Sequence, residues 1–140
     1  MTGGRLKRVA HHLDPNETFC MTYGDGLSDV NIADLIAFHK AQKREATLTV
    51  VEPSGRFGAT KLEGDAVSEF VEKPAGDGGY INGGFFVLEP SVLSRIGDDD
   101  TVWERGPLEG LASDGESSAF RHNGFWLPMD NLRDKRMLDE

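Results

Sequence analysis

The sequence has little cysteine and no long apolar run. Cys20 is the only cysteine among the 140 residues, so the chain cannot form an internal disulfide or a cysteine-based metal cluster. We expect its thiol to be reduced and packed in the core, because free cysteine is among the most buried residue types. No apolar run approaches the roughly 20 residues of a bilayer-spanning helix, and the first residues do not resemble a secretory signal. These absences predict a cytoplasmic protein with no membrane segment.

Positive charge is also scarce. Lysine and arginine number 15 against 24 aspartates and glutamates, which gives a formal net charge of -9 at pH 7. Nucleic-acid binding needs a basic face, so we expect no nucleic-acid partner. A small phosphorylated substrate is not excluded, because a few local cations and a metal ion are enough to hold one. The length suits a single domain, residues 1–140.

Apolar residues alternate between helical and strand periodicity along the chain. The patterns predict strands over 19–23, 46–51, 80–88 and 118–121, a hairpin over 57–72, and helices over 5–13, 31–44, 90–96, 101–111 and 131–138. Asp29 or Asn31 is the expected cap of the second helix. A strand–helix–strand order predicts parallel strands with right-handed crossovers, and the hairpin adds antiparallel character. The predicted fold class is therefore α/β, with a mixed, mainly parallel sheet and flanking helices.

One carboxylate stands between two glycines directly after the first strand, in Tyr23-Gly24-Asp25-Gly26. Ligands of open α/β sheets bind beyond the carboxyl ends of strands, and flanking glycines leave room for them. The segment Phe125–Asp130 has a similar look. If the fold brings Asp25 and Asp130 together, they form an all-oxygen site suited to Mg²⁺ carrying a phosphate substrate. The alternative is an ordinary Asp-Gly turn.

Three further motifs carry groups suited to a phosphorylated sugar or nucleotide. Lys73, before Pro74, offers a point charge for a phosphate, and Glu72 can accept from a sugar hydroxyl. The run 82–84, Asn-Gly-Gly, lies inside an apolar strand, where glycine often marks the close approach of a ligand or another backbone. The run 2–5, Thr-Gly-Gly-Arg, offers backbone amides and a guanidinium to a phosphate or base. Each motif also has a purely structural alternative. Residues 72–74 are then a solvated strand end, residues 82–84 a structural bulge, and residues 2–5 an unstructured start.

Together these motifs resemble those of the sugar-phosphate nucleotidyltransferases. The resemblance rests on six segments in family order: 1–8, 22–26, 55–59, 72–74, 81–87 and 124–130. Glu-Lys-Pro and Asn-Gly-Gly occur across the superfamily, whereas the first and last segments are similar to the cytidylyltransferase branch. This branch transfers CMP from CTP to glucose 1-phosphate, giving CDP-glucose and pyrophosphate, and serves lipopolysaccharide O-antigen biosynthesis. Two alternatives stay open: transfer with another base or hexose 1-phosphate, and an inactive sugar-phosphate-binding or subunit-assembly module.

The resemblance also implies roles for individual residues. Asp25 and Asp130 would be Mg²⁺ ligands and, with Lys73, the catalytic groups. The implied substrate-binding residues are Arg5 and Gly24 for the nucleotide and Glu72, Lys73, Asn82 and Gly83 for the sugar phosphate. A sugar phosphate oxygen attacks the α-phosphorus of CTP and expels pyrophosphate, so catalysis is positioning and charge stabilisation. The family usually forms homo-oligomers.

One part of the family pattern is not found in the sequence. The family opens with a strand, a Gly-x-Gly-Thr-Arg loop that cradles the triphosphate, and a Pro-Lys. Here the resemblance begins in the middle of the pattern. We therefore expect the chain to correspond to the C-terminal two-thirds of a nucleotidyltransferase domain, an incomplete Rossmann-like unit with exposed sheet edges. CTP turnover by this chain alone is expected to be impaired.

Overall fold

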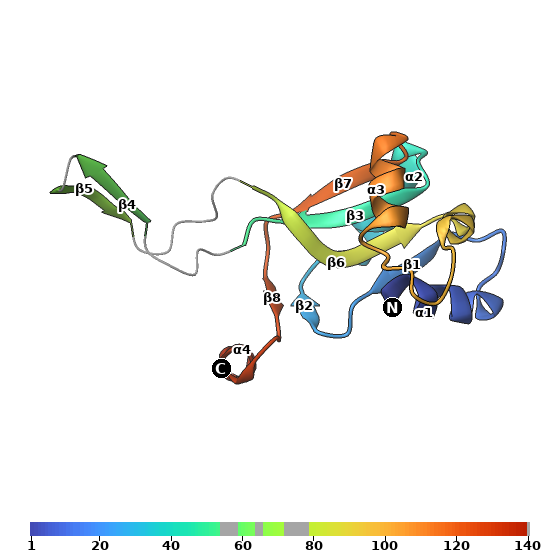
Figure 1. The fold of residues 1–140 in the computed structure, drawn as a ribbon, viewed down its shortest axis with the longest axis horizontal. Coiled ribbons are helices and arrows are strands. Elements are labelled where there is room, and N and C mark those ends of the chain that lie inside the picture. The colour runs from blue at the N-terminus through green and yellow to red at the C-terminus, as the bar shows by residue number, and fades with distance from the viewer. Residues whose placement is uncertain (54–58, 64–65, 72–78, 140) are drawn as a thin grey trace.

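A four-stranded mixed sheet forms the centre of the molecule. The computed structural model describes residues 1–53, 59–63, 66–71 and 79–139. The strand order is β1-β6-β3-β7 (Figure 1), and the strands are β1 (Phe19–Thr22), β3 (Ala46–Val51), β6 (Ile81–Leu88) and β7 (Ser117–His122). β3 and β7 pair in parallel, whereas β6 is antiparallel to both of its neighbours. The predicted mixed sheet is confirmed, with β6 running against the other strands.

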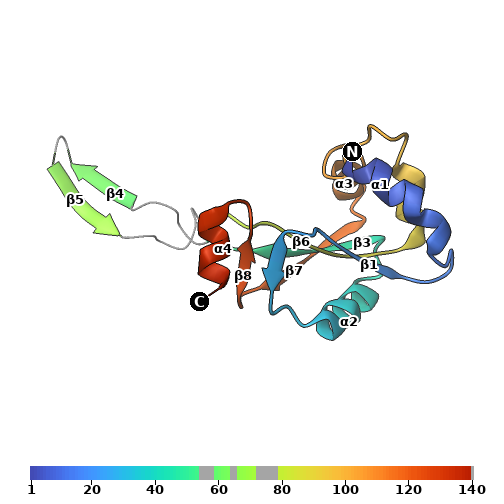
Figure 2. The same cartoon turned by 90° about the horizontal axis from the view of Figure 1, so that it is seen from below.

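Helices cover both faces of this sheet. One face carries α1 (Thr2–Val9), η1 (Ala10–His12), η2 (Pro90–Arg95) and α3 (Gly106–Ser113), and the opposite face carries α2 (Ile32–Gln42) (Figure 2). The main core lies under the first group and consists of Leu6, Ala46, Phe86, Leu88, Val92, Ile96, Trp103 and Leu111. At its centre the rings of Phe86 and Trp103 meet edge to face with 6.0 Å between centroids. The main core is therefore buried between the sheet and these helices.

Helix α2 has a well-defined start and end. The side-chain oxygen of Asn31 accepts hydrogen bonds from the amides of Ala33 and Asp34 at 3.0 and 3.2 Å. Such a cap satisfies amides that have no partner inside the helix. Asn31 is therefore the cap, and Asp29 is not. The helix ends slightly earlier than predicted because Lys43 adopts a left-handed conformation, with φ of 53°.

A buried histidine joins α2 to the sheet. His39 is 1% exposed, and its Nδ1 lies 2.9 Å from Thr47 Oγ1 while its Nε2 lies 3.0 Å from Glu89 Oε1. The Thr18 hydroxyl donates to the same carboxylate oxygen at 2.8 Å. Burial acts to raise the pKa of Glu89, but the hydrogen bonds from His39 and Thr18 outweigh it and the pKa lies below its ordinary value. His39 is thus a structural group that fixes α2 against the sheet.

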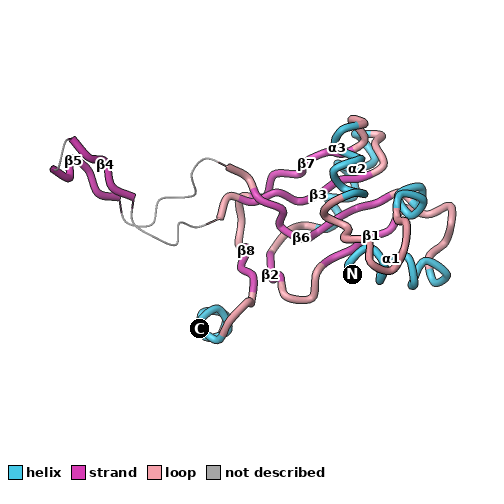
Figure 3. The backbone as a smooth tube through the Cα atoms, in the orientation of Figure 1, coloured by secondary structure: helices cyan, strands magenta, loops and turns pink. Residues whose placement is uncertain are grey.

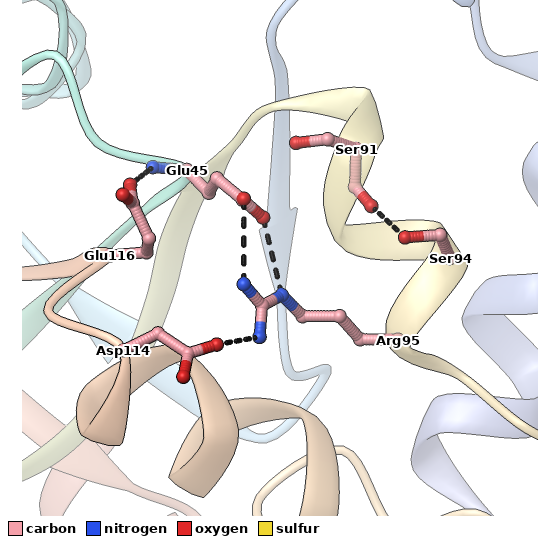
Figure 4. A network of polar contacts seen from close by, with 6 residues as sticks. All are labelled: Glu45, Ser91, Ser94, Arg95, Asp114 and Glu116. Atoms are coloured by element: carbon pink, nitrogen blue, oxygen red, sulfur yellow. Dashed lines mark hydrogen bonds and ion pairs between the residues drawn. The ribbon is translucent and has the colours of Figure 1, made fainter.

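An ion-pair network ties the ends of several elements together (Figure 4). The guanidinium of Arg95 binds both carboxylate oxygens of Glu45, with Nε at 3.2 Å and Nη2 at 3.4 Å, and donates to Asp114 at 2.7 Å. The amide of Glu45 in turn donates to Glu116 at 3.3 Å. This network connects the loop before β3 with η2 and with the end of α3. It lies at the end of the sheet opposite to β2 and β8 (Figure 1).

Two short strands that the sequence patterns do not predict lie at the end of the main sheet. β2 (Gly26–Ser28) and β8 (Trp126–Pro128) form an antiparallel pair of their own, and α4 (Leu132–Leu138) follows β8 (Figure 3). The predicted hairpin is confirmed as β4 (Ala59–Glu63) and β5 (Ala66–Val71). None of the helices in the described ranges has the length and apolarity to cross a bilayer.

The predicted core position of Cys20 is wrong. Side chains alternate along β1, and Phe19 and Met21 pack against the main core, so Cys20 faces the other side, where it is exposed. Helix α2, which covers that side, packs against β3, β6 and β7. The edge strand β1 therefore keeps one open face. Partial burial still raises the pKa of the Cys20 thiol above its ordinary value.

The segment predicted as a helix over 101–111 is helical only from Gly106 onward. Pro107 occupies the first turn of α3, where its missing N–H costs no hydrogen bond. The preceding residues form turns, in which the amide of Thr101 donates to the carbonyl of Asp98 at 3.2 Å. The Gly-Pro pair thus lies at the start of the helix.

Candidate metal and substrate site

The β2–β8 ladder brings the two aspartate-bearing segments side by side. Gly26 pairs with Pro128, and the amide of Met129 donates to the carbonyl of Asp25 at 2.7 Å. Asp25 and Asp130 therefore lie on neighbouring strand ends, although 105 positions separate them in the sequence. Both residues are exposed. The structure thus brings the backbones of the two segments together, and the metal site itself stays a prediction.

The β8 segment is held against the main sheet by its tryptophan. The indole N–H of Trp126 donates to the carbonyl of Gly83 in β6 at 2.8 Å. A Cβ at Gly83 would lie 3.1 Å from the Thr49 carbonyl and 3.2 Å from a Val51 methyl, so the missing side chain serves close packing. Trp126 therefore links the Trp-Leu-Pro-Met-Asp motif to the Asn-Gly-Gly motif.

A second brace lies at the other end of β2 and β8. His122 Nε2 is 2.9 Å from a carboxylate oxygen of Asp29 and 3.1 Å from the carbonyl of Phe125. A Cβ on Gly124 would lie 2.5 Å from that Asp29 oxygen and 2.7 Å from the His122 ring. A larger residue here would displace the side chains of Asp29 and His122, which gives the first residue of the 124–130 motif a packing role. These contacts fix the path of the chain from β7 to β8 and therefore the position of the segment that carries Asp130.

The Asn-Gly-Gly motif forms a bulge in β6. The β3–β6 register shifts between Leu48 and Val50, and Gly84 has φ of +79°. Asn82 closes the bulge, since its side-chain oxygen accepts from the Gly84 amide at 2.9 Å. The bulge alternative for this motif is therefore confirmed. The half-buried Asn82 lies near Tyr23, with which it also interacts, so it remains beside the candidate site.

Tyr23 packs directly on this bulge. Its amide donates to the Gly84 carbonyl at 3.2 Å, and a Cβ on Gly84 would lie only 2.8 Å from the Tyr23 ring. The hydroxyl donates a hydrogen bond to the carboxylate of Glu104. Burial and the contact with Glu104 raise the pKa of Tyr23 well above its ordinary value, with a smaller contribution from the charge of Asp25, while Asn82 lowers it. The phenol is therefore neutral at any physiological pH.

Arg5 lies on α1, whose glycines serve packing. A Cβ on Gly3 would lie 2.9 Å from the Thr101 carbonyl, and one on Gly4 would lie 2.2 Å from the Asp99 carbonyl. The Gly4 amide donates to Thr101 at 3.3 Å and the Arg5 amide donates to Met1 at 3.1 Å, so these two amides are not available to a phosphate. The expectation that the Thr-Gly-Gly-Arg backbone binds phosphate is wrong at these positions. The guanidinium of Arg5 belongs to an exposed residue and stays a predicted nucleotide contact.

The other predicted substrate residues differ in what the structure says of them. Gly24 is exposed, and a Cβ added there would meet nothing within 4 Å, which leaves the room that a nucleotide needs. Gly83 is buried and already committed to packing. Glu72 and Lys73 lie outside the described residues, so their roles stay predictions.

The carboxylate pair suits Mg²⁺ in its donor chemistry. Mg²⁺ is usually held by one or two carboxylates and completes its shell with water and substrate phosphates, and exposed Asp25 and Asp130 leave such positions open. Among the described residues, no group of three or more His, Cys, Asp or Glu side chains forms a full metal cage. A site of this kind gains most of its affinity when the phosphate substrate is present.

Comparison with known proteins identifies the class to which this fold belongs. The nucleotidyl transferase family model matches residues 5–113, and the chain belongs to this family. The resemblance read from the motifs is thereby confirmed.

The individual relatives are sugar-phosphate nucleotidyltransferases. Glucose-1-phosphate cytidylyltransferase of Salmonella typhi is 56% identical over 99% of this chain and 54% of its own length. A probable glucose-1-phosphate cytidylyltransferase of Bacillus subtilis is 40% identical over 95% of this chain and 52% of its own length. The chain thus spans about half the length of these relatives. The crystal structure of HddC from Yersinia pseudotuberculosis shares the fold, with a TM-score of 0.70 at 21% identity over 97% of this chain and 60% of that one.

Proposed function

We propose that the chain is the metal- and sugar-phosphate-binding portion of a glucose-1-phosphate cytidylyltransferase, which transfers CMP from CTP to glucose 1-phosphate. The observation that carries the proposal is the 56% identity with such an enzyme across 99% of the chain. The proposal includes Mg²⁺ as the cofactor, a cytoplasmic location and assembly into a homo-oligomer. It also includes a product, CDP-glucose, that serves lipopolysaccharide O-antigen biosynthesis.

In this proposal, Asp25 and Asp130 hold the metal ion. The ion, when bound, supplies positive charge to the phosphoryl oxygens on which negative charge develops. Arg5 offers its guanidinium to the nucleotide, and the open space beside Gly24 lets the nucleotide approach the backbone. Asn82, Glu72 and Lys73 orient the sugar phosphate. Every contribution is positioning or charge stabilisation, so the reaction needs no side-chain nucleophile.

The first test is calorimetric titration of the chain with glucose 1-phosphate in the presence of Mg²⁺. We expect binding of glucose 1-phosphate, weaker binding of mannose 1-phosphate and no binding of unphosphorylated glucose. Asp100→Asn removes an exposed acid in the 98–100 turn and should bind glucose 1-phosphate like the wild type. A chain that binds none of the sugars, while circular dichroism shows it folded, would contradict the proposal.

The second test is release of pyrophosphate from CTP plus glucose 1-phosphate, with GTP plus mannose 1-phosphate as the comparison pair. We expect weak release, or none, from this chain alone and cytidylyl transfer from the corresponding protein at the length of its relatives. Activity confined to GTP and mannose 1-phosphate would replace the proposed base and sugar. Binding without turnover in the longer protein would favour an inactive binding module.

A further inference from the structure

Glu104 joins the two segments that carry the proposed nucleotide and metal residues. One carboxylate oxygen accepts the hydroxyl of Tyr23, in the Tyr-Gly-Asp-Gly motif. The other accepts the hydroxyl of Thr2, in the Thr-Gly-Gly-Arg motif, at 2.8 Å. The residue lies 81 and 102 positions from these two partners and belongs to none of the motifs from which the family is read.

The carboxylate is itself firmly placed. The Thr2 hydroxyl that donates to Glu104 accepts from the backbone amide of Trp103 at 2.9 Å, which closes a ring of hydrogen bonds with the residue next to Glu104. The Trp103 side chain is fully buried at the centre of the core. Because Glu104 follows this buried residue directly, its carboxylate holds the hydroxyls of Tyr23 and Thr2 in fixed positions relative to the core.

Tyr23 is the anchor nearest to Asp25 on its N-terminal side. Between them lies only Gly24, which has no side chain and would meet nothing within 4 Å if it had a Cβ. On its C-terminal side Asp25 is followed by the β2–β8 ladder. The backbone at Asp25 is thus held on one side by Tyr23 and on the other by the β2–β8 ladder.

Core packing needs the ring of Tyr23 and does not need its hydroxyl. The ring contacts Phe86 edge to face with 5.6 Å between centroids, and a phenylalanine fills the same space. The tyrosine–glutamate pair therefore points to a requirement for geometry.

We propose that Glu104 is a positioning residue: by holding the Tyr23 hydroxyl it fixes the backbone that presents Asp25 to the metal ion. The inference rests on the proposed function, because it assumes that Asp25 binds a metal. Partners that orient metal ligands commonly change metal affinity by about 10- to 100-fold when they are removed. Tyr23 acts through two peptide bonds, so we expect the lower end of that range, about tenfold.

The test is Mn²⁺ binding to the folded chain, measured by electron paramagnetic resonance in the presence of glucose 1-phosphate. We expect Tyr23→Phe and Glu104→Ala each to weaken binding about tenfold, and the double variant to be no weaker than either single one. Glu104→Gln keeps an acceptor oxygen for the Tyr23 hydroxyl and should restore most of the affinity. Tyr80→Phe is the matched control, since Tyr80 is the only other tyrosine, and it should bind like the wild type.

The outcomes separate this inference from the proposed function. All measurements are made at a temperature where circular dichroism shows every variant fully folded, so a loss of stability alone leaves the affinity unchanged. If Asp25→Asn abolishes binding while Tyr23→Phe and Glu104→Ala bind like the wild type, the inference is wrong and the metal site stands. If the wild type does not bind Mn²⁺, or Asp25→Asn binds as well as the wild type, the metal site and the inference both fail.

Discussion

Replacing Gly84 by alanine tests the close contact between the β6 bulge and the ring of Tyr23, beside the candidate site. Gly84 has φ of +79°, and a Cβ there would lie 2.8 Å from the Tyr23 ring. The left-handed conformation costs an L-residue about 1–2 kcal/mol, and forcing a methyl group into a packed site costs about 1–3 kcal/mol more. Gly84→Ala should therefore lower the free energy of unfolding by about 2–5 kcal/mol.

Two other glycines separate these contributions. Gly115 has φ of +73° but open space around it, so Gly115→Ala should show the conformational cost alone, about 1–2 kcal/mol. Gly24 has open space and no positive φ in the left-handed range, so Gly24→Ala should leave stability within about 1 kcal/mol of the wild type.

The assay is urea denaturation of the three variants, followed by tryptophan fluorescence and far-ultraviolet circular dichroism. The expected order of stability is Gly24→Ala, then Gly115→Ala, then Gly84→Ala. Equal losses for Gly84→Ala and Gly115→Ala would refute the close contact with Tyr23. No loss for Gly84→Ala would refute the bulge conformation itself.

Three further predictions concern ionisable groups. His39→Ala should lower the free energy of unfolding by about 2–4 kcal/mol, measured by urea denaturation, because it empties a buried site and leaves Thr47 and Glu89 without their partner; a loss below about 1 kcal/mol would show that the buried contacts are absent. Exposed Cys20 should react with iodoacetamide in the folded chain, and because its pKa is raised the rate should still be increasing above about pH 8.5; protection equal to that of a core thiol would contradict its placement on the open face. Burial acts to raise the pKa of Glu104, but hydrogen bonds from Tyr23, the backbone and Thr2 hold it below its ordinary value, so the stability it adds is present above about pH 4.3 and lost as the pH falls further. Thermal melts from pH 6 to pH 3 should therefore show a smaller acid-induced loss for Glu104→Gln than for the wild type, and identical profiles would contradict this.

The elements that the sequence predicts well are those with a local signal. β1, β3, β6 and α2 each carry an apolar periodicity or a cap within a few residues. The short strands β2 and β8 carry no such signal: three residues cannot show alternation, and β8 ends on a proline, which pattern rules exclude from most strands. The proximity of Asp25 and Asp130 depends on that pair of strands. The motifs therefore indicate two candidate ligands, and only the tertiary structure brings their backbones together.

The errors have a common physical origin in packing between distant segments. Alternation along β1 predicts which residues share a face with Cys20, but whether that face is covered depends on where α2 packs. Gly3 and Gly4 have the composition of a phosphate-binding loop, yet they are small because the 98–101 turn approaches α1 closely. Glu104 stands outside every motif, and its contacts with Tyr23 and Thr2 become visible only in the fold.

The central claim is that Asp25 and Asp130 bind one divalent metal ion together. The most direct measurement is a Mn²⁺ titration by electron paramagnetic resonance, with glucose 1-phosphate present, of the wild type, Asp25→Asn, Asp130→Asn and the control Asp100→Asn. We predict a single tight site in the wild type and the control, and loss of that site in either of the other two variants. Retention of the site in both Asp25→Asn and Asp130→Asn would contradict the claim.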